Sequence, residues 1–323
     1  MNFVSIPKNG SSWQEPLIYS FETEGAIPTD VVVEICDVGA NSTLATKSLY
    51  GVASGEIDIA PYLRSLCDQH IKLADANSVT NTQMARTILV KINGSESESR
   101  LFMPRSIDIT KPRILTRFSS DSSFAIGDVI AFSVFVPSNL IVVANIVYAS
   151  NRQQVHLQFA ASNSIVDVVI RTHNLRQNVE FIDLDIHCGG TVVKSIRLSA
   201  IEPHPRRRQL LWRNQWGGVE SYVFPQSITL ARTVDAETLK LASRDVVMLS
   251  GAEQRSRLCS AFETEQELER ISEIVLSPYV CSAVEGELCE VKLDNRTIEY
   301  DAHGNLRQIV LDVTSKWEGG GLW

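Results

Sequence analysis

Six strand-like runs follow one another between Asp128 and Ser199, about twelve residues apart, and no helical pattern lies between them. Turn signals separate the runs, namely "IGD", "SNRQ", "THNLRQN" and "CGG". The runs themselves are rich in β-branched and aromatic residues: "DVIAFSVFV", "LIVVANIVYA", "QVHLQFA", "IVDVVIRT", "EFIDLDIHC" and "TVVKSIRLS". Because strands that alternate with helices would be needed for a parallel sheet, this pattern predicts an antiparallel β-sandwich.

The first hundred residues show a similar pattern, in "PLIYSFETE", "DVVVEICDV" and "ARTILVKI". One helical interruption is expected at "APYLRSLCDQH", where Leu63, Leu66 and Cys67 fall on one face. Pro104 and Pro112 lie between strand runs and favour an extended linker. We therefore predict a β-sandwich domain over residues 1–105 and a second over 106–205, both of immunoglobulin or fibronectin type.

The pattern changes after residue 205, and residues 206–323 are predicted to form a small α+β domain. Its clearest helix is "ETEQELERISEIVLSP", with an apolar stripe at Leu268, Ile271 and Val275. Thr264 and Glu267 have the spacing of a capping box, and a proline ends the run. Strands are expected on both sides of this helix. The whole chain is thus predicted to be mainly β.

Charge and hydropathy narrow the classes of partner. The 323 residues carry a formal net charge of −8, which argues against nucleic acid because phosphate binding needs a positive field. Only Arg206, Arg207 and Arg208 offer a local basic patch, as a binding hypothesis beside the alternative of a solvated linker. The longest apolar stretch, near Leu140, is interrupted by Asn145 and is too short to span a bilayer. The N-terminus lacks the pattern of a secretion signal, so we expect cytoplasmic synthesis.

One strand carries residues of the kind that bind metals. In "FIDLDIHC", Asp183, Asp185 and His187 alternate with apolar residues and would therefore share one face. Two carboxylates and an imidazole can bind a divalent metal. The alternative is that the apolar residues face the core and the polar trio forms the wet face of an antiparallel sheet. Since no phosphate-binding loop and no nucleophile elbow occurs, we expect no cofactor and no catalytic activity.

The stretch "QLLWRNQWGGVESYVFP" favours a strand, a turn with Asn and Gly, and a returning strand. Trp212, Trp216 and Tyr222 would form an aromatic platform for a sugar if they were exposed. The alternative is core or interdomain packing, because tryptophan brings a large apolar area with one N–H to satisfy. In that case the glycines would allow close approach or a sharp corner.

The same stretch resembles the signature W-x-N-x-x-G-G-x-[DE]-x-[YF]-x-F of tail-associated structural proteins of bacteriophages and prophages. In that family a capped helix ending in SP-x-V and a strand follow the signature, and residues 264–295 show this order. The resemblance covers the last third of the chain. Two residues depart from the pattern: Trp216 stands where a smaller residue is expected, and Glu220 replaces the more usual Asp.

The resemblance implies a component of a virion or tail-like particle that forms oligomers and contacts other particle subunits or a host surface. It supplies no catalytic residues. A carbohydrate-binding adhesion module, built on the aromatic platform, is the alternative function, and a metal-dependent hydrolase built on the strand of Asp183 is a third.

Overall fold

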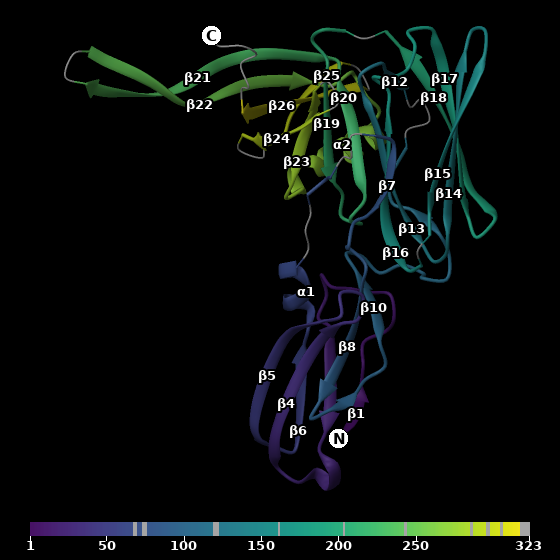
Figure 1. The fold of residues 1–323 in the computed structure, drawn as a ribbon, viewed down its shortest axis with the longest axis vertical. Coiled ribbons are helices and arrows are strands. Elements are labelled where there is room, and N and C mark those ends of the chain that lie inside the picture. The colour runs from purple at the N-terminus through teal and green to yellow at the C-terminus, as the bar shows by residue number, and fades with distance from the viewer. Residues whose placement is uncertain are drawn as a thin grey trace.

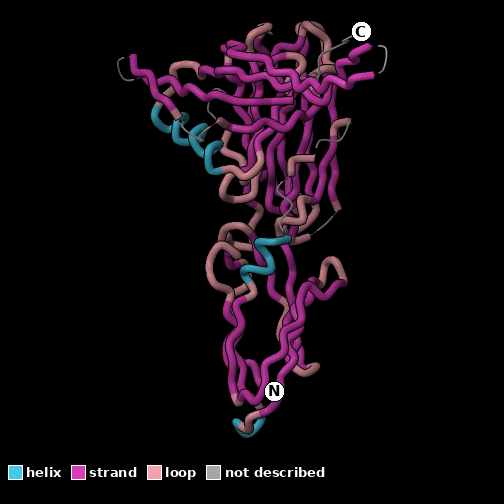
Figure 2. The backbone as a smooth tube through the Cα atoms, turned by 90° about the vertical axis from the view of Figure 1, so that its left-hand side faces the viewer, coloured by secondary structure: helices cyan, strands magenta, loops and turns pink. Residues whose placement is uncertain are grey.

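The computed structural model describes residues 1–66, 70–72, 76–118, 123–160, 162–202, 204–241, 244–284, 287–294, 298–303 and 306–316. The chain is mainly β, as predicted, and its strands form several largely antiparallel sheets. The molecule is elongated: one sandwich forms one end, and a second sandwich and a further sheet lie together at the other (Figures 1 and 2). Among the described helices, none has the length and apolar character required to cross a membrane.

The first sandwich packs two sheets around a core of alternating residues. One sheet has the order β1 (Asn2–Ser5), β3 (Ile18–Glu22) and β6 (Ser54–Asp58). The other has the order β2 (Ser11–Ser12), β10 (Arg100–Met103), β8 (Arg86–Ile92), β4 (Thr29–Asp37) and β5 (Ser42–Val52), with β9 (Ser95–Glu96) against β8. In β4, Val31, Val33 and Ile35 point inward because successive side chains alternate between faces. A 3-10 helix, Glu24–Ala26, and helix α1, Ala60–Leu66, complete this part.

Helix α1 lies where the helical interruption is predicted. Its buried residues are Ala60 and Leu63, whereas Leu66 is 37% exposed. The predicted stripe is therefore correct at Leu63 and wrong at Leu66, since the helix ends there and the last residue faces solvent. Cys67 lies outside the described residues.

The second sandwich also has two sheets. One has the order β11 (Arg113–Ile114), β13 (Val129–Val136), β16 (Ser164–Arg171) and β7 (Ser78–Asn81). The other has the order β12 (Ser123–Ala125), β18 (Thr191–Ile201), β17 (Val179–Cys188), β14 (Leu140–Tyr148) and β15 (Arg152–Phe159). Strands β13 and β16 are buried along their whole length, because the sheet that contains them is covered on both faces.

The third region is one sheet with a helix against it. The strand order is β20 (Val219–Phe224), β19 (Arg208–Arg213), β23 (Val280–Val284), β24 (Glu287–Leu293), β26 (Leu306–Lys316), β22 (Arg244–Cys259) and β21 (Gln226–Leu241), with β25 (Glu299–His303) against β26. Helix α2 (Glu265–Ser272) packs against β26 and continues as a 3-10 turn, Glu273–Leu276. Beyond the rest of the sheet, β21 and β22 project together as a long hairpin (Figure 1).

Helix α2 confirms the predicted apolar stripe, because Leu268 and Ile271 are buried and Val275 packs against the same core. Thr264 is the N-cap residue, but its side chain makes no capping hydrogen bond. Glu267 instead accepts from the guanidinium of Arg270, one turn further along the helix. The predicted capping box is therefore wrong, since a charged partner within the helix takes the carboxylate that the box requires.

The boundaries near residues 105 and 205 stay a prediction. Strand β7 lies in the sequence range of the first sandwich but pairs with β16 of the second, with Val79 opposite Val168. The chain therefore contributes one strand to the second sandwich before the main strands of that sandwich begin.

Candidate functional site

The hairpin of the Trp-Gly-Gly stretch is formed by β19, β20 and the turn between them, as predicted from the Asn and Gly residues. Leu210 opposes Tyr222, and Trp212 opposes Glu220. The side chain of Asn214 closes the turn: its Oδ1 accepts hydrogen bonds from the backbone N–H of Trp216 and of Gly218, both at 2.9 Å. An asparagine side chain that bonds to backbone two residues on is a common way to fix a turn.

Both glycines of the turn are required because the turn backbone lies very close to neighbouring residues. A Cβ on Gly217 would lie 2.8 Å from Pro104 Cγ and 3.0 Å from Met84 Sδ, and its φ of +78° lies in the left-handed region. A Cβ on Gly218 would lie 2.8 Å from Leu115 Cβ. The turn thus presses against the end of the first sandwich and the segment that leaves it, at distances that no side chain allows.

A buried ion pair joins the hairpin to the second sandwich. Nη1 and Nη2 of Arg213 donate to the two carboxylate oxygens of Asp167 on β16, at 2.8 and 2.7 Å. The same carboxylate accepts from the hydroxyl of Ser133 on β13, and that hydroxyl accepts from the backbone N–H of Val219. Because the Arg213 and Asp167 side chains are only 2% and 5% exposed, this bidentate pair is shielded from water.

A second buried carboxylate, Glu220, joins the hairpin to helix α2. Its Oε1 accepts from Asn214 Nδ2 and from the backbone N–H of Arg117, at 2.8 and 2.9 Å. Its Oε2 accepts from Arg270 Nη1 at 3.1 Å. Burial raises the pKa of the Glu220 carboxyl above its ordinary value, and the charge of Arg270 opposes this rise.

The strand β19 also contacts the second sandwich through Gln209. Its side-chain amide accepts from the backbone N–H of Val129 and donates to the backbone carbonyl of the same residue, at 2.9 and 2.7 Å. An apolar layer of Val129, Ala131, Val169, Leu211, Val219 and Cys281 fills the space between the two sheets. We call the set of Gln209, Arg213, Asn214, Gly217, Gly218 and Glu220 with their partners the hairpin junction.

The aromatic residues of the stretch do not form an exposed platform. Trp212 is 0% exposed and lies in the core of the third region. The hydroxyl of Tyr222 donates to Glu263 Oε1 at 2.7 Å, and burial raises the pKa of this phenol. Trp216 packs against the core of the first sandwich and lies under the guanidinium of Arg113, at 3.9 Å. The sugar platform is thus corrected to the packing alternative, because Trp212 and Tyr222 pack in the core of the third region, Trp216 packs against the first sandwich, and Trp212 has no accessible face.

The three arginines before the hairpin lie in different surroundings. Arg206 is exposed, and its backbone N–H donates to His204 Nδ1. Arg207 forms an ion pair with the largely buried Asp128 of the second sandwich. Arg208 begins β19, where it pairs with Phe224. At least one of the three charges is therefore used within the chain, and a binding role of Arg206 and Arg208 stays a prediction.

The polar trio of β17 follows the predicted alternation. Ile182, Leu184 and Ile186 are fully buried in the core of the second sandwich. On the other face, Asp183 accepts two hydrogen bonds from Arg197, and Asp185 accepts from Ser195 Oγ at 2.6 Å. Within the described residues, no group of three or more His, Cys, Asp or Glu side chains is placed to hold a metal ion. The metal hypothesis for Asp183, Asp185 and His187 is corrected to the wet face of the sheet.

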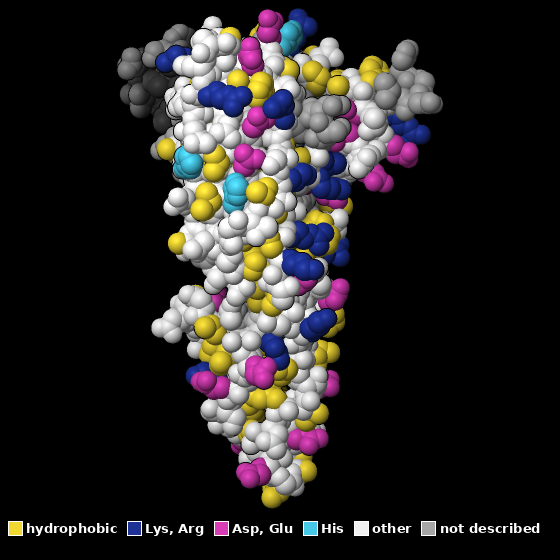
Figure 3. Space-filling view, turned by 90° about the vertical axis from the view of Figure 1, so that its right-hand side faces the viewer, with side chains coloured by type: hydrophobic (Ala, Val, Ile, Leu, Met, Phe, Trp, Pro, Cys, Tyr) yellow, Lys and Arg dark blue, Asp and Glu magenta, His cyan; other side chains and the backbone are white. Residues whose placement is uncertain are grey.

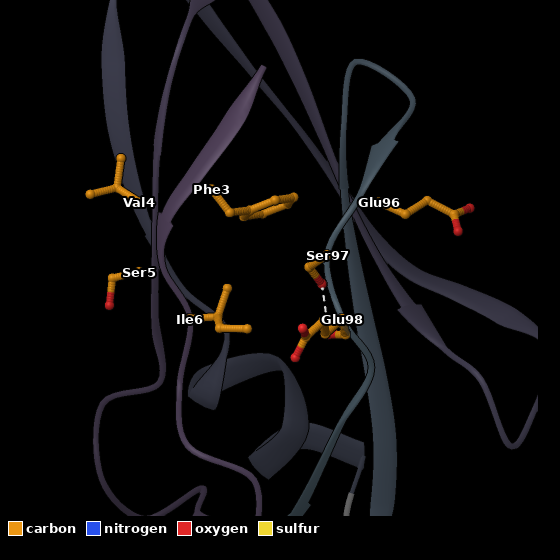
Figure 4. A pocket seen from close by; sticks show the side chains of 7 residues that line it. All are labelled: Phe3, Val4, Ser5, Ile6, Glu96, Ser97 and Glu98. Atoms are coloured by element: carbon orange, nitrogen blue, oxygen red, sulfur yellow. Dashed lines mark hydrogen bonds between the residues drawn. The ribbon is translucent and has the colours of Figure 1, made fainter.

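A shallow pocket of about 300 Å³ lies at the open edge of the first sandwich, between β1 and the β9 segment. Phe3, Ile6 and Ser97 point toward its centre, while Val4 and Glu96 point away (Figure 4). The hydroxyl of Ser97 donates to the carbonyl of Glu98 and accepts from the backbone N–H of Val90. The inward hydroxyl is thus engaged in holding the strand segment rather than free for chemistry.

Sequence reasoning found the hairpin and its glycines but missed Asp167, Ser133 and Gln209. A signal for the first two was present, since each is a polar residue inside a continuous apolar run, at "IVDVVI" and "AFSVFV". A polar residue in a fully buried strand requires a hydrogen-bonded partner.

Comparison with known proteins adds little to this geometry. No protein-family model and no curated protein matches the chain. Among solved structures, one titled "Crystal structure of CBD12 from CALX1.2" is similar at 12% sequence identity with a TM-score of 0.17, covering 53% of this chain and 73% of that one.

Proposed function

We propose that the chain is a noncatalytic assembly component of a phage or prophage tail-like particle, acting through protein–protein contacts. The observation that carries the proposal is the hairpin junction. The stretch that resembles the tail-associated family is also the stretch that fastens the two sandwiches and the third sheet to one another.

Asn214 and Glu220, which the resemblance singles out, and Arg213, which stands at an unspecified position of the signature, each contact another part of the chain. Asn214 contacts the segment after the first sandwich through Leu115, Arg213 contacts the second sandwich, and Glu220 contacts helix α2. A motif with these contacts fixes the relative orientation of the three parts. This is the requirement of a rigid subunit in a symmetric particle, where contact surfaces must be held at fixed angles.

The surface also agrees with a role in assembly. Figure 3 shows hydrophobic side chains in small groups between polar ones over one long face of the molecule. Exposed apolar residues occur on each of the three parts, for example Tyr50 at 78%, Val192 at 55% and Leu276 at 78%. Scattered residues of this kind are normal on a protein surface, so they are compatible with contacts to neighbouring subunits without indicating them.

The test is to look for the chain in particles. Antibodies raised against the purified chain would be used to label, with gold, density-purified particles from cultures of the organism that encodes it. We expect label on the tail or an equivalent part of the particle, and the chain in the mass spectrum of the same fraction. Particles that contain the neighbouring structural proteins but neither label nor peptides would overturn the proposal.

A further inference from the structure

The hairpin of β21 and β22 extends from the third sheet beyond the last residue at which another described strand pairs with it. Each strand has 16 residues, and at ~3.4 Å per residue β21 is about 50 Å long. Among the described residues, β26 pairs with β22 from Glu253 to Cys259. From Val234 and Ala252 outward, the described part of the hairpin is a ribbon of two strands, which we call the arm (Figure 1).

The free edge of the hairpin is longer than the arm itself. Among the described strands, β21 pairs with β22 and with no other, so its outer edge is unpaired from Gln226 to Leu241. Every residue from Ile228 to Val234 is exposed. Three of them are large apolar residues: Ile228 and Leu230 at 45% and Val234 at 41%.

This exposure distinguishes β21 from the other long edge strand, β5. The residues Leu44, Ala45 and Leu49 of β5 pack against the core of the first sandwich, so that strand is held from one face. The stretch from Ile228 to Val234 has neither face covered. From Ile228 to Thr233 the strand pairs with residues 253–257 of β22, which pair in turn with β26, so this edge is held in place and open. A long exposed edge strand pairs readily with another chain.

We propose that the outer edge of β21 pairs, antiparallel, with the same edge of a second copy of this chain. Two copies related by a two-fold axis would satisfy both free edges in one contact, because an antiparallel edge is complementary to itself. Side chains of the two strands then become direct cross-strand neighbours, which shields Ile228, Leu230 and Val234.

The size of the contact indicates a dimer of modest affinity. A standard interface takes roughly 20 to 30 residues from each partner. The outer edge of β21 supplies 16 residues from each copy, so we expect the dimer to dissociate on dilution. This pairing rests on the proposed function, because it takes from that proposal the premise that the chain acts through protein contacts.

The experiment compares the full-length chain with two triple variants. Ile228→Asp, Leu230→Asp and Val234→Asp together place charges on the free edge. The matched control, Ile18→Asp, Val32→Asp and Ile201→Asp, changes apolar residues of similar exposure on other strands, at 42%, 41% and 46%. Sedimentation equilibrium over a hundredfold range of concentration measures the dissociation constant of each.

We expect the wild type and the control to reach twice the mass of one chain, with the same dissociation constant. The edge variant should dissociate at least about tenfold more readily, because the paired edge would bury unpaired carboxylates. A wild type that stays monomeric, or an edge variant that dimerises like the control, would overturn the inference.

Hydrogen exchange on the wild type keeps the inference testable if the edge variant misfolds. Amides of residues 226–241 should gain protection as the concentration rises, whereas those of β5 should not. Unchanged protection in β21 would also overturn the pairing. A monomeric chain that is nevertheless labelled on particles contradicts this inference alone, while a dimer through β21 without particle label contradicts only the proposed function.

Discussion

Asn214 illustrates how much of the hairpin junction depends on single side chains. Asn214 is 6% exposed, and both polar atoms of its side-chain amide form hydrogen bonds. The oxygen fixes the turn, and the nitrogen donates to Leu115 O and to Glu220 Oε1, each at 2.8 Å. The sequence indicates a turn at this asparagine. It does not indicate the two acceptors, which lie 99 and 6 residues away along the chain.

Replacement of Asn214 by Ala should lower the free energy of unfolding by about 2–4 kcal/mol, because it leaves several buried partners without a hydrogen bond. The measurement is urea unfolding followed by tryptophan fluorescence. Gln215→Ala is the matched control, since Gln215 is the exposed neighbour in the same turn. Equal losses for the two variants would show that the buried contacts of Asn214 contribute nothing.

Glu220 gives a prediction about pH. Its pKa is raised by burial, so the folded chain retains this proton at a higher pH than the unfolded chain does. The stabilisation from the protonated carboxyl is therefore full below the unfolded value of about 4.3 and is lost as the pH rises through the folded value. Glu220→Gln cannot ionise, so the unfolding free energy of the wild type minus that of the variant should fall as the pH rises above about 4.

Urea unfolding at a series of pH values measures this difference directly. Glu265→Gln, on the exposed first turn of α2, is the control that removes a carboxyl from the surface. A difference for Glu220 that stays constant with pH, or that grows as the pH rises, would contradict a raised pKa for this carboxyl.

At the scale of elements, the apolar runs of the sequence predict β13 and β16 but not the role of these strands. Both strands are buried on both faces, because one face packs in the second sandwich and the other meets β19 and β20. A run that is apolar at every position is typical of a strand covered on two sides. It does not reveal which element provides the second cover.

The buried pair of Arg213 and Asp167 joins these strands, and it can be tested by a double-mutant cycle. Asp167→Asn alone should cost about 3–5 kcal/mol, because it leaves the Arg213 charge buried without a counter-ion. Combined with Arg213→Met, the loss should be smaller than the sum of the single losses by about 1–3 kcal/mol. Chemical denaturation of the four proteins measures the coupling.

The pair Arg197 and Asp183 provides the comparison for that cycle. It has similar bidentate geometry, but the Arg197 side chain is 63% exposed. Its coupling should be much smaller than that of the buried pair, as for exposed ion pairs in general. A larger coupling on the surface than in the junction would refute the view that burial makes Asp167 critical.

For the whole molecule, the sequence predicted the kind of structure better than its connections. Alternation and turn residues identify most strands, since these are local properties. Pairings such as β7 with β16, or Gly218 against Leu115, join residues about a hundred positions apart and follow from packing of the complete chain. The same limit explains why the role of the aromatic residues could not be predicted. The sequence allows packing and a sugar platform as alternatives, and Trp212 is buried because the third sheet and its core surround it.

The connection between the three parts leads to a last prediction, on cooperativity. Gly218 has an ordinary φ, yet a Cβ there would lie 2.8 Å from Leu115 Cβ and 3.1 Å from its carbonyl carbon. Gly218→Ala must therefore move the hairpin away from Leu115, which belongs to the core of the first sandwich. We expect a loss of about 1–3 kcal/mol.

Calorimetry should also show a change in the shape of the transition. If the hairpin junction couples the parts, the wild type melts in one main transition, and Gly218→Ala separates a transition of the first sandwich from the rest, because domains with a weakened interface unfold independently. Gly39→Ala is the control, since the nearest atom to its Cβ is Asp37 Oδ1 at 3.4 Å and its φ is ordinary. A wild type that already melts in separate steps, with Gly218→Ala leaving them unchanged, would mean that the junction orients the parts without coupling their stability.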